Sequence, residues 1–246
     1  MPHELRLGTR GSALALWQAN TVAASIAAAG GPPCRIVIIK TTGDRLQDAP
    51  LSEVGGKRLF VKEIEDALLR HDVDLAVHSS KDLPAVLPEG LTITAALPRE
   101  DPLDAVLLPS TGETVRAVTT VEALVAHLGQ SPSIGTSSVR RIAQLTRLFP
   151  GARFTPIRGN LATRLRNLDE GQPAAIVLAA AGLRRLGFAA RISLTLPAAA
   201  CVPAPGQGIV AIEIRERDHA VRDAVSRIDD PAAAAALEAE RAVVEA

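Results

Sequence analysis

A short apolar run that leads into Gly-Thr, a serine and a helix occurs twice in this sequence, and it constrains the fold more than any other feature. The copies are LGTRGS at residues 7–12 and IGTSS at residues 134–138. Strands that alternate with helices in this way are typical of an α/β fold. The backbone N–H groups at such helix starts attract anions. A serine at this place is more often simply a helix cap, so the anion site is one of two alternatives.

The order of predicted elements divides the chain into two similar α/β lobes joined by two crossing segments, residues 97–103 and 203–208. Residues 35–40 are predicted to be a fully buried parallel strand because they contain an unbroken apolar run. Residues 209–214 have strand character and need a sheet to join. We therefore expect a discontinuous first lobe, 1–98 plus 209–228, and an inserted second lobe, 103–202.

The stretch DLAVHSSKDLP, residues 74–84, is the strongest candidate for chemistry in the first lobe. Its apolar part predicts a buried strand, and ligands of open α/β sheets bind where such strands end. Asp82 lies in the polar part that follows. A single carboxylate among cationic groups is suited to proton transfer or to stabilising a cation. The alternative is an exposed loop aspartate beside a loop lysine.

Positive charge is concentrated in the second lobe, although the net charge of the whole chain is zero. Residues 131–191 contain ten arginines, no lysine and two acids. The guanidinium fork binds carboxylates in a bidentate way, so the cluster predicts an anionic ligand. A genome that favours arginine would explain the excess of arginine over lysine, but not the clustering. Aromatic residues make up only 2%, which argues against a reader of single-stranded nucleic acid.

Other classes of function find little support in the sequence. The longest apolar run, residues 174–181, is too short to cross a membrane. The N-terminus lacks an apolar signal segment, which predicts a cytoplasmic protein. Cys34 and Cys201 form no disulfide framework, and the scattered histidines predict no metal site. The long polar stretch from Thr41 to Lys57 is predicted to be a lid or a disordered loop.

Eight motifs between Leu5 and Arg241 together resemble the porphobilinogen deaminase (hydroxymethylbilane synthase) family. In chain order they are LGTRGSALALWQ, GGKRLFVKEIEDALL, DLAVHSSKDLP, REDPLDAVL, IGTSSVRRIAQL, RGNLATRL, AAGLRRLG and PAPGQGIVAIE. The resemblance implies two lobes like those of periplasmic binding proteins and a third domain. It also implies stepwise condensation of four porphobilinogens with loss of ammonia, giving hydroxymethylbilane for haem biosynthesis. The implied protein is a cytoplasmic monomer that binds porphobilinogen and polypyrrole intermediates, but no nucleic acid and no membrane.

The resemblance also implies roles for individual residues. Asp82 would be catalytic, bonding pyrrole N–H groups, assisting proton transfer and stabilising a cationic intermediate. Most of the other matching residues would hold acetate and propionate side chains, and Phe60 and Gln207 would line the cleft. The implied substrate- and cofactor-binding residues are Arg10, Ser12, Lys57, Phe60, Lys81, Thr136, Ser137, Ser138, Arg140, Arg141, Arg158, Arg164, Arg185 and Gln207.

One departure from the family pattern concerns the dipyrromethane cofactor. The family carries it on a cysteine in a Gly-Gly-Cys turn beyond the segment that matches Glu240 and Arg241, and this sequence does not contain that turn. Residues 229–246 are therefore expected to be a stub of the cofactor domain, in a helix that continues past Ala246. We expect no cofactor on this chain and no activity by itself. The alternative is a cofactor-free, two-lobed binding module for a small carboxylated ligand.

Overall fold

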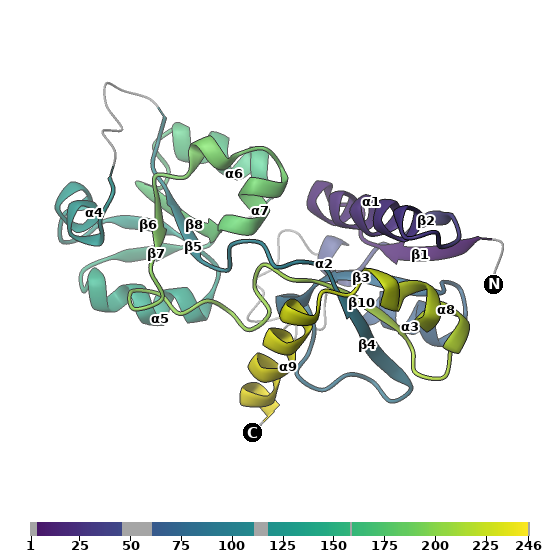
Figure 1. Ribbon diagram of the computed structural model, residues 1–246. Helices are drawn as coiled ribbons and strands as arrows, with labels where there is room; N and C mark the ends of the chain where they lie inside the picture. Colours follow the sequence, from purple (N-terminus) through teal and green to yellow (C-terminus); the bar gives the residue numbers. More distant parts are fainter. Residues whose placement is uncertain (1–3, 46–60, 111–117, 158, 246) are drawn as a thin grey trace. The chain divides into compact units, whose positions relative to one another are not determined.

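Two mixed β-sheets, each covered by helices on both faces, make up the part of the chain that the computed structural model describes, residues 4–45, 61–110, 118–157 and 159–245. The chain divides into two units, Met1–Glu100 with Pro205–Ala246, and Asp101–Ala204. Both units combine strands with helices, which confirms the predicted α/β class (Figure 1).

The sheet of the first unit has the strand order β2-β1-β3-β10-β4. β1 (Leu5–Thr9) pairs in parallel with β2 (Cys34–Ile38) and β3 (Leu75–Ser79), whereas β10 (Val210–Arg215) runs antiparallel to β3 and to β4 (Leu91–Ala96). The strand that was expected to return to the first sheet thus lies between β3 and β4. It is the only described partner of β4.

Helices bury both faces of the first sheet. α1 (Ala13–Ala28) and α8 (His219–Val225) pack on one face, where Val22 and Ala224 join the core of Leu7, Val77 and Ile212. α3 (Lys62–Leu69) and α9 (Pro231–Glu245) contribute to the clusters on the other face. The short elements of this unit are α2 (Thr42–Arg45) and the 3₁₀ turns η2 (Ser80–Asp82) and η4 (Ser226–Ile228).

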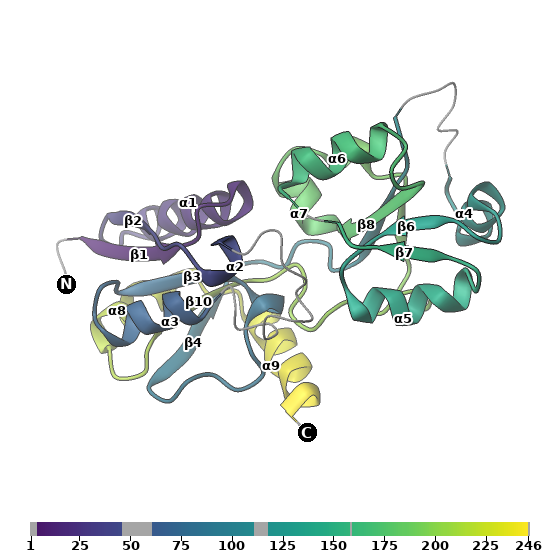
Figure 2. The same cartoon turned by 180° about the vertical axis from the view of Figure 1, so that it is seen from behind.

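The sheet of the second unit has the order β7-β6-β8-β5-β9. β6 (Ser133–Gly135) is parallel to β7 (Arg153–Thr155) and β8 (Ala175–Ala179), while β5 (Asp104–Leu107) is antiparallel to β8 and β9 (Leu194–Leu196). Figure 2 shows α6 and α7 on one side of this sheet and α5 on the other. The helices are α4 (Val121–Leu128), α5 (Val139–Leu148), α6 (Leu161–Asp169), α7 (Ala180–Arg185) and the 3₁₀ turn η3 (Ala189–Arg191).

The two sheets repeat one topology, with β1, β2, β3, β10 and β4 matching β6, β7, β8, β5 and β9. The register agrees as well. Ala76 is opposite Glu213 in the first sheet, and Ile176 is opposite Leu107 in the second. The sequence repeat described above therefore corresponds to the turns that follow β1 and β6. This equivalence allows residues of one unit to be compared with residues at the same place in the other.

Two strand predictions differ from the structure. The strand expected over 35–40 is parallel but not buried: β2 is an edge strand, and the Ile38 side chain is 55% exposed. An apolar run shows that a strand is favourable, but it does not show how many neighbours the strand has. β9 was not predicted, because its three residues are too short to give a periodic signal. Of the expected lid, Thr41 and α2 are described, and the rest lies outside the described residues.

Candidate functional site

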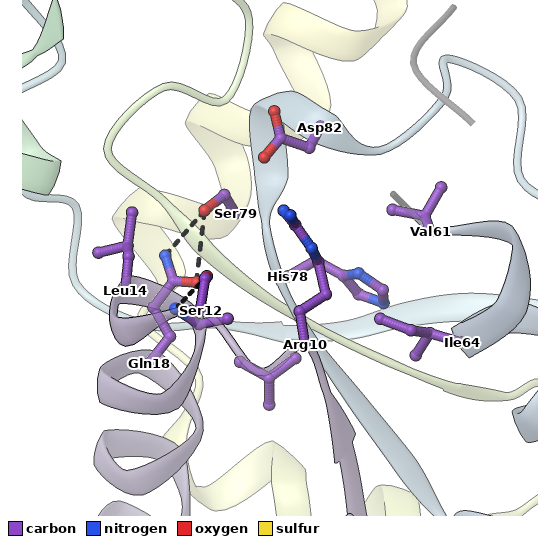
Figure 3. A pocket seen from close by; sticks show the side chains of 11 residues that line it. Arg10, Ser12, Leu14, Gln18, Val61, Ile64, His78, Ser79 and Asp82 are labelled. Carbon is purple, nitrogen blue, oxygen red and sulfur yellow. Dashed lines mark hydrogen bonds between the residues drawn. The ribbon is translucent and has the colours of Figure 1, made fainter. Parts of the chain in front are cut away.

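A small cavity of about 70 Å³ opens at the carboxyl ends of β1 and β3 in the first unit. Four of its lining residues carry polar groups suited to a charged ligand: Arg10, Ser12, His78 and Asp82 (Figure 3). The rest of the lining is Leu14, Ala15, Gln18, Val61, Ile64, Val77 and Ser79. The sequence thus predicted Arg10, Ser12 and Asp82 as site residues, and the structure places all three at one cavity.

Asp82 is presented by the turn that ends β3. The strand is buried from Leu75 to His78, and the turn η2 follows, with the buried Leu83 anchoring its far end. Asp82 itself is half-buried. Among the described residues its carboxylate has no hydrogen-bond or ion-pair partner, and Figure 3 shows it on the other side of the cavity from Ser12 and Gln18. A carboxylate placed in this way is available to a ligand.

The neighbouring Lys81 connects the Asp82 turn to the returning segment before β10. Its Nζ donates to Oε1 of Gln207 at 3.3 Å, and the backbone carbonyl of Gln207 accepts from Nε of Arg99 at 3.0 Å. Gln207 is buried between two glycines of positive φ, Gly206 at +70° and Gly208 at +90°. The structure therefore brings the predicted residues Lys81, Asp82 and Gln207 into one region of the first unit.

Arg10 and Ser12 come from the turn between β1 and α1. Ser12 is the N-cap of α1, and its hydroxyl accepts from the backbone N–H of Ala15 at 3.3 Å. Gln18, one turn further along α1, donates to the Ser79 hydroxyl at 2.9 Å and so connects the helix start to the end of β3. Ser12 is therefore a helix cap, as one of the two alternatives predicted. The N-terminus of α1 still favours binding of an anion through its electrostatic potential.

A buried polar pair that we did not single out from the sequence lies beneath this cavity. Nε2 of His78 lies 3.1 Å from Oε2 of Glu213, and both side chains are almost wholly inaccessible to solvent. Neither Glu213 oxygen has an aligned hydrogen bond. The available signal was a single glutamate within the apolar run GIVAIEIR, where an unpaired charge would be unfavourable.

The second copy of the Gly-Thr motif uses its hydroxyl groups locally. Ser138 caps α5 and accepts from the N–H of Arg141 at 3.4 Å. The Ser137 hydroxyl donates to the carbonyl of Ile157 at 3.1 Å, and the buried Thr136 hydroxyl accepts from the N–H of Ser138 at 3.2 Å. These residues shape the start of α5, and their role in binding stays a prediction.

Arg140 and Arg141 are bound to a buried carboxylate, Asp104 at the start of β5. Nη1 of Arg140 is 2.7 Å from Oδ2, and Nη2 and Nε of Arg141 lie 2.7 and 3.0 Å from Oδ1. These guanidinium groups hold the pKa of Asp104 far below its ordinary value despite its burial. We did not single out Asp104 from the sequence. That Arg140 and Arg141 also bind substrate stays a prediction.

Arg164 has a different environment in the same unit. Its Nε donates to the carbonyl of Gly159 at 2.9 Å, and no acidic partner accompanies it among the described residues. Burial, with repulsion from Arg141, lowers the pKa of Arg164. A partly buried cation of this kind favours an anionic ligand. Arg185 lies in the last turn of α7, whereas Lys57, Phe60 and Arg158 lie outside the described residues.

Neither thiol of the chain is activated. Cys201 is fully buried and donates to Oδ2 of Asp104 at 3.3 Å; burial and that carboxylate raise its pKa to about 11. Burial, with a smaller contribution from Glu4, raises the pKa of Cys34 to about 11. The thiolate is the reactive form, so both cysteines are poor nucleophiles.

The described part of the chain has neither a metal-binding cluster nor a membrane-spanning helix. No group of three or more His, Cys, Asp or Glu side chains there could hold a metal ion. No helix among those residues combines the length and apolar character that a membrane crossing requires.

A larger hollow of about 330 Å³ lies between β4 and α9 in the first unit. Its charged lining residues are Asp229, Glu238 and Arg241, but Asp229 already accepts from the backbone N–H of Ala96 at 2.7 Å. The remaining lining is mostly apolar or threonine. The smaller cavity beside Asp82 therefore has the arrangement better suited to chemistry.

Comparison with known proteins finds a matching family model and similar curated relatives. The family model for "Porphobilinogen deaminase, dipyromethane cofactor binding domain" matches residues 5–223. The chain is 47% identical over 241 residues to the porphobilinogen deaminase of Syntrophobacter fumaroxidans, covering 98% of this chain and 74% of that one. It is 46% identical over 244 residues to that of Geobacter metallireducens, covering 99% and 73%.

Solved structures show the same fold at low sequence identity. An ancestral cationic amino acid solute binding protein aligns with a TM-score of 0.54 at 13% identity, over 98% of this chain and 95% of that one. The VFT2 domain of BvgS from Bordetella pertussis aligns with a TM-score of 0.51 at 15% identity, over 96% and 92%. These likenesses confirm the expected lobes of periplasmic-binding-protein type.

Proposed function

The chain belongs to the porphobilinogen deaminase family of tetrapyrrole-forming transferases, whose cofactor is dipyrromethane, and on this premise we propose that its site serves the head-to-tail condensation of four porphobilinogens in the cofactor-bearing enzyme. Each step releases ammonia, and hydrolysis gives hydroxymethylbilane for haem biosynthesis. We further propose a cytoplasmic monomer that binds porphobilinogen and polypyrrole intermediates but neither nucleic acid nor membranes. Gel filtration at several concentrations tests the oligomeric state.

The observation that carries this proposal is the carboxylate of Asp82, which has no partner in the described part of the chain and lies at a cavity lined by Arg10 and His78. Loss of ammonia from porphobilinogen leaves positive charge on the pyrrole that remains. A carboxylate held at that point stabilises the charge, bonds the pyrrole N–H and accepts the ring proton that is lost on coupling. Asp82 supplies this group without competing with a second carboxylate among the described residues that line the cavity.

The substrate side chains require cationic partners, since each pyrrole unit carries two carboxylates. In the first unit, Arg10, Lys81 and the N-terminus of α1 lie beside Asp82 and are suited to this role. In the second unit, the best candidate is Arg164, which has no acidic partner among the described residues. Thr136, Ser137, Ser138, Arg140, Arg141, Arg185 and Gln207 remain proposed binding residues, and so do Lys57, Phe60 and Arg158.

The residues of the first unit fit the dipyrromethane cofactor as a polyanion, because Arg10, Lys81 and Ser12 offer cationic and hydroxyl donors near one acceptor, Asp82. When bound, this group supplies the pyrrole ring to which the first substrate is joined. Neither cysteine fits a thioether anchor, because Cys201 is enclosed by Asp104 and both thiols resist deprotonation.

Asp82→Asn tests the proposed chemistry in the holoenzyme, the form that carries covalent dipyrromethane. The amide keeps the shape of the side chain but can neither accept the proton nor offset the positive charge. We expect kcat to fall about a hundredfold or more, with folding unchanged. Asp72→Asn, an exposed aspartate of the same unit, is the matched control and should retain full activity. Near-normal turnover by Asp82→Asn would remove Asp82 from the chemistry.

The environment of the two cysteines favours a second candidate for this 246-residue chain by itself, a cofactor-free binding module for a carboxylated ligand. We propose that the purified chain carries no covalent dipyrromethane and makes no hydroxymethylbilane. Intact mass and Ehrlich's reagent decide between the candidates. A mass increment of cofactor size together with the colour reaction would contradict this proposal.

A further inference from the structure

His78 and Glu213 form a polar pair in the interior of the first sheet. His78 is on β3 and Glu213 is on the adjacent strand β10, and their relative exposures are 4% and 0%. The Glu213 carboxylate lies where β10 shifts its register against β4, between Ile212 and Glu213. Such irregularities redirect side chains and are frequent beside functional sites. The pair therefore lies at a specialised point of the sheet.

The second sheet shows that the fold does not need this pair. In the matching register, His78 corresponds to Leu178 on β8, and Glu213 corresponds to Leu107 on β5. Both leucines belong to one apolar cluster that packs against α6 and α7. Two leucines thus satisfy the same sheet positions by packing alone. Replacing a buried charged pair by apolar residues is commonly neutral or stabilising, so the polar pair in the first unit points to a function.

The environment of the pair determines where its protons lie. A net negative charge at Glu213 would be strongly unfavourable, because neither carboxylate oxygen has an aligned hydrogen bond and the side chain is fully buried. Two neutral arrangements avoid this: imidazolium with carboxylate, and neutral imidazole with carboxylic acid. Each places one proton between Nε2 and Oε2, which are 3.1 Å apart. Each also leaves a proton on Nδ1 of His78.

Nε2 of His78 is engaged by Glu213, so Nδ1 is the ring nitrogen left for a ligand in the cavity. Nε2 is fully buried against Glu213, whereas His78 as a residue contributes to the cavity lining beside Val61 and Ile64 (Figure 3). The other charged groups of the lining are Arg10 and Asp82. On the elements packed around the pair, Glu65 of α3 is a buried acid, and Arg215 pairs with Asp74 and Asp218.

We propose that His78 is a ligand-binding residue that offers Nδ1–H to a carboxylate in this cavity, and that Glu213 keeps it in that protonation state. Glu213 acts as a positioning residue, because it is buried and acts through the imidazole. The cavity of about 70 Å³ has room for one small polar substituent but not for a pyrrole chain. Arg10 would share the same carboxylate. The inference rests on the proposed function, which supplies the carboxylated ligand.

Nitrogen NMR of the wild-type chain labelled with ¹⁵N-histidine tests the protonation state directly. At about pH 7, Nδ1 of His78 should give the shift of a protonated nitrogen, and Glu65→Gln should leave that shift in place. Assignment uses the signal lost in His78→Gln. An unprotonated Nδ1 would overturn the proposal, because His78 would then be an acceptor that repels a carboxylate.

The double variant His78→Leu with Glu213→Leu tests the binding role, since it copies the leucine pair of the second sheet. We expect wild-type or higher resistance to urea, and porphobilinogen affinity lower by about tenfold or more, measured by calorimetry. Equal affinity in a folded double variant would overturn the proposal; if the variant does not fold, the NMR result decides. Failure of the proposed function would give a different result in the same measurement, because the wild-type chain itself would then bind no porphobilinogen.

Discussion

The donors around the Asp104 carboxylate include Nε and Nη2 of Arg141, Nη1 of Arg140 and the Cys201 thiol. Asp82 has none among the described residues. The same functional group therefore serves different purposes in the two units. Asp104 is a fixed counter-ion that anchors the first turn of α5 to β5, while Asp82 remains available for a ligand.

Asp104→Asn is expected to destabilise the second unit. The amide leaves the buried Arg141 without a compensating charge, and breaking a buried ion pair in this way costs about 3–5 kcal/mol. Urea unfolding followed by circular dichroism measures the loss. Glu170→Gln, which changes an exposed acid of the same unit, should have little effect. A wild-type unfolding midpoint for Asp104→Asn would show that the arginines do not depend on this carboxylate.

The pH dependence of stability provides the second part of this test. The folded pKa of Asp104 is depressed below the ordinary value of about 3.9, so its stabilising contribution is fully present above that pH. It is lost as the pH falls below about 4, because the unfolded chain then takes up a proton that the folded chain does not. The stability difference between wild type and Asp104→Asn should therefore shrink in that range.

The turn from Gly206 to Gly208 holds the start of β10 against the first crossing segment, residues 97–103. Gly208 has a φ of +90°, and a Cβ atom at this position would lie 2.1 Å from the carbonyl oxygen of Glu100. The N–H of Glu100 in turn donates to the carbonyl of Gly208 at 3.0 Å. Both the conformation and the close approach of the two backbones require glycine.

Gly208→Ala should be more damaging than an alanine at another glycine of positive φ in the same unit. Gly30 has a φ of +74°, and its added Cβ would meet no atom within 4 Å. Gly30→Ala is therefore expected to lower the free energy of unfolding only by the cost of holding alanine in the left-handed conformation, about 1–2 kcal/mol. Gly208→Ala must also move the Glu100 carbonyl. Thermal unfolding compares the two variants, and equal losses would show that the contact with Glu100 is unimportant.

The sequence predicted most strands because their apolar runs are bounded by Gly, Pro and polar residues, as at Leu75–Ser79 and Ala175–Ala179. It singled out Asp82 because its turn directly follows such a run, whereas the resemblance to the family implied Arg10 and Ser12 as binding residues. It did not distinguish the edge strand β2 from a central strand, since strand order is a long-range property. It also missed Asp104 and Glu213, whose importance depends on partners more than thirty residues away in the chain.

At the scale of the whole molecule, the two units repeat one sheet topology but differ in chemistry. Ser80, Lys81 and Asp82, which follow β3, have Ala180, Ala181 and Gly182 as their counterparts after β8. The pair His78 and Glu213 likewise has two leucines as its counterpart. The cavity with its acid and histidine groups thus belongs to the first unit, whereas the described part of the second unit contains the partly buried cation Arg164. A duplicated scaffold supports this specialisation because one strand order can present different side chains at equivalent places.

The division of the chain predicts which parts fold alone. Residues 101–204 contain all five strands of the second sheet and both of its apolar clusters, so this fragment should show a cooperative urea transition by itself. Residues 1–100 should not, because they lack β10, which pairs with both β3 and β4 and supplies Val210, Ile212 and Ile214 to the core. Joining 1–100 to 205–246 through a short Gly/Ser linker should restore folding, since Glu100 is hydrogen-bonded to Gly208. A cooperative transition in 1–100 alone would mean that β10 is dispensable, and it would contradict the discontinuous first unit.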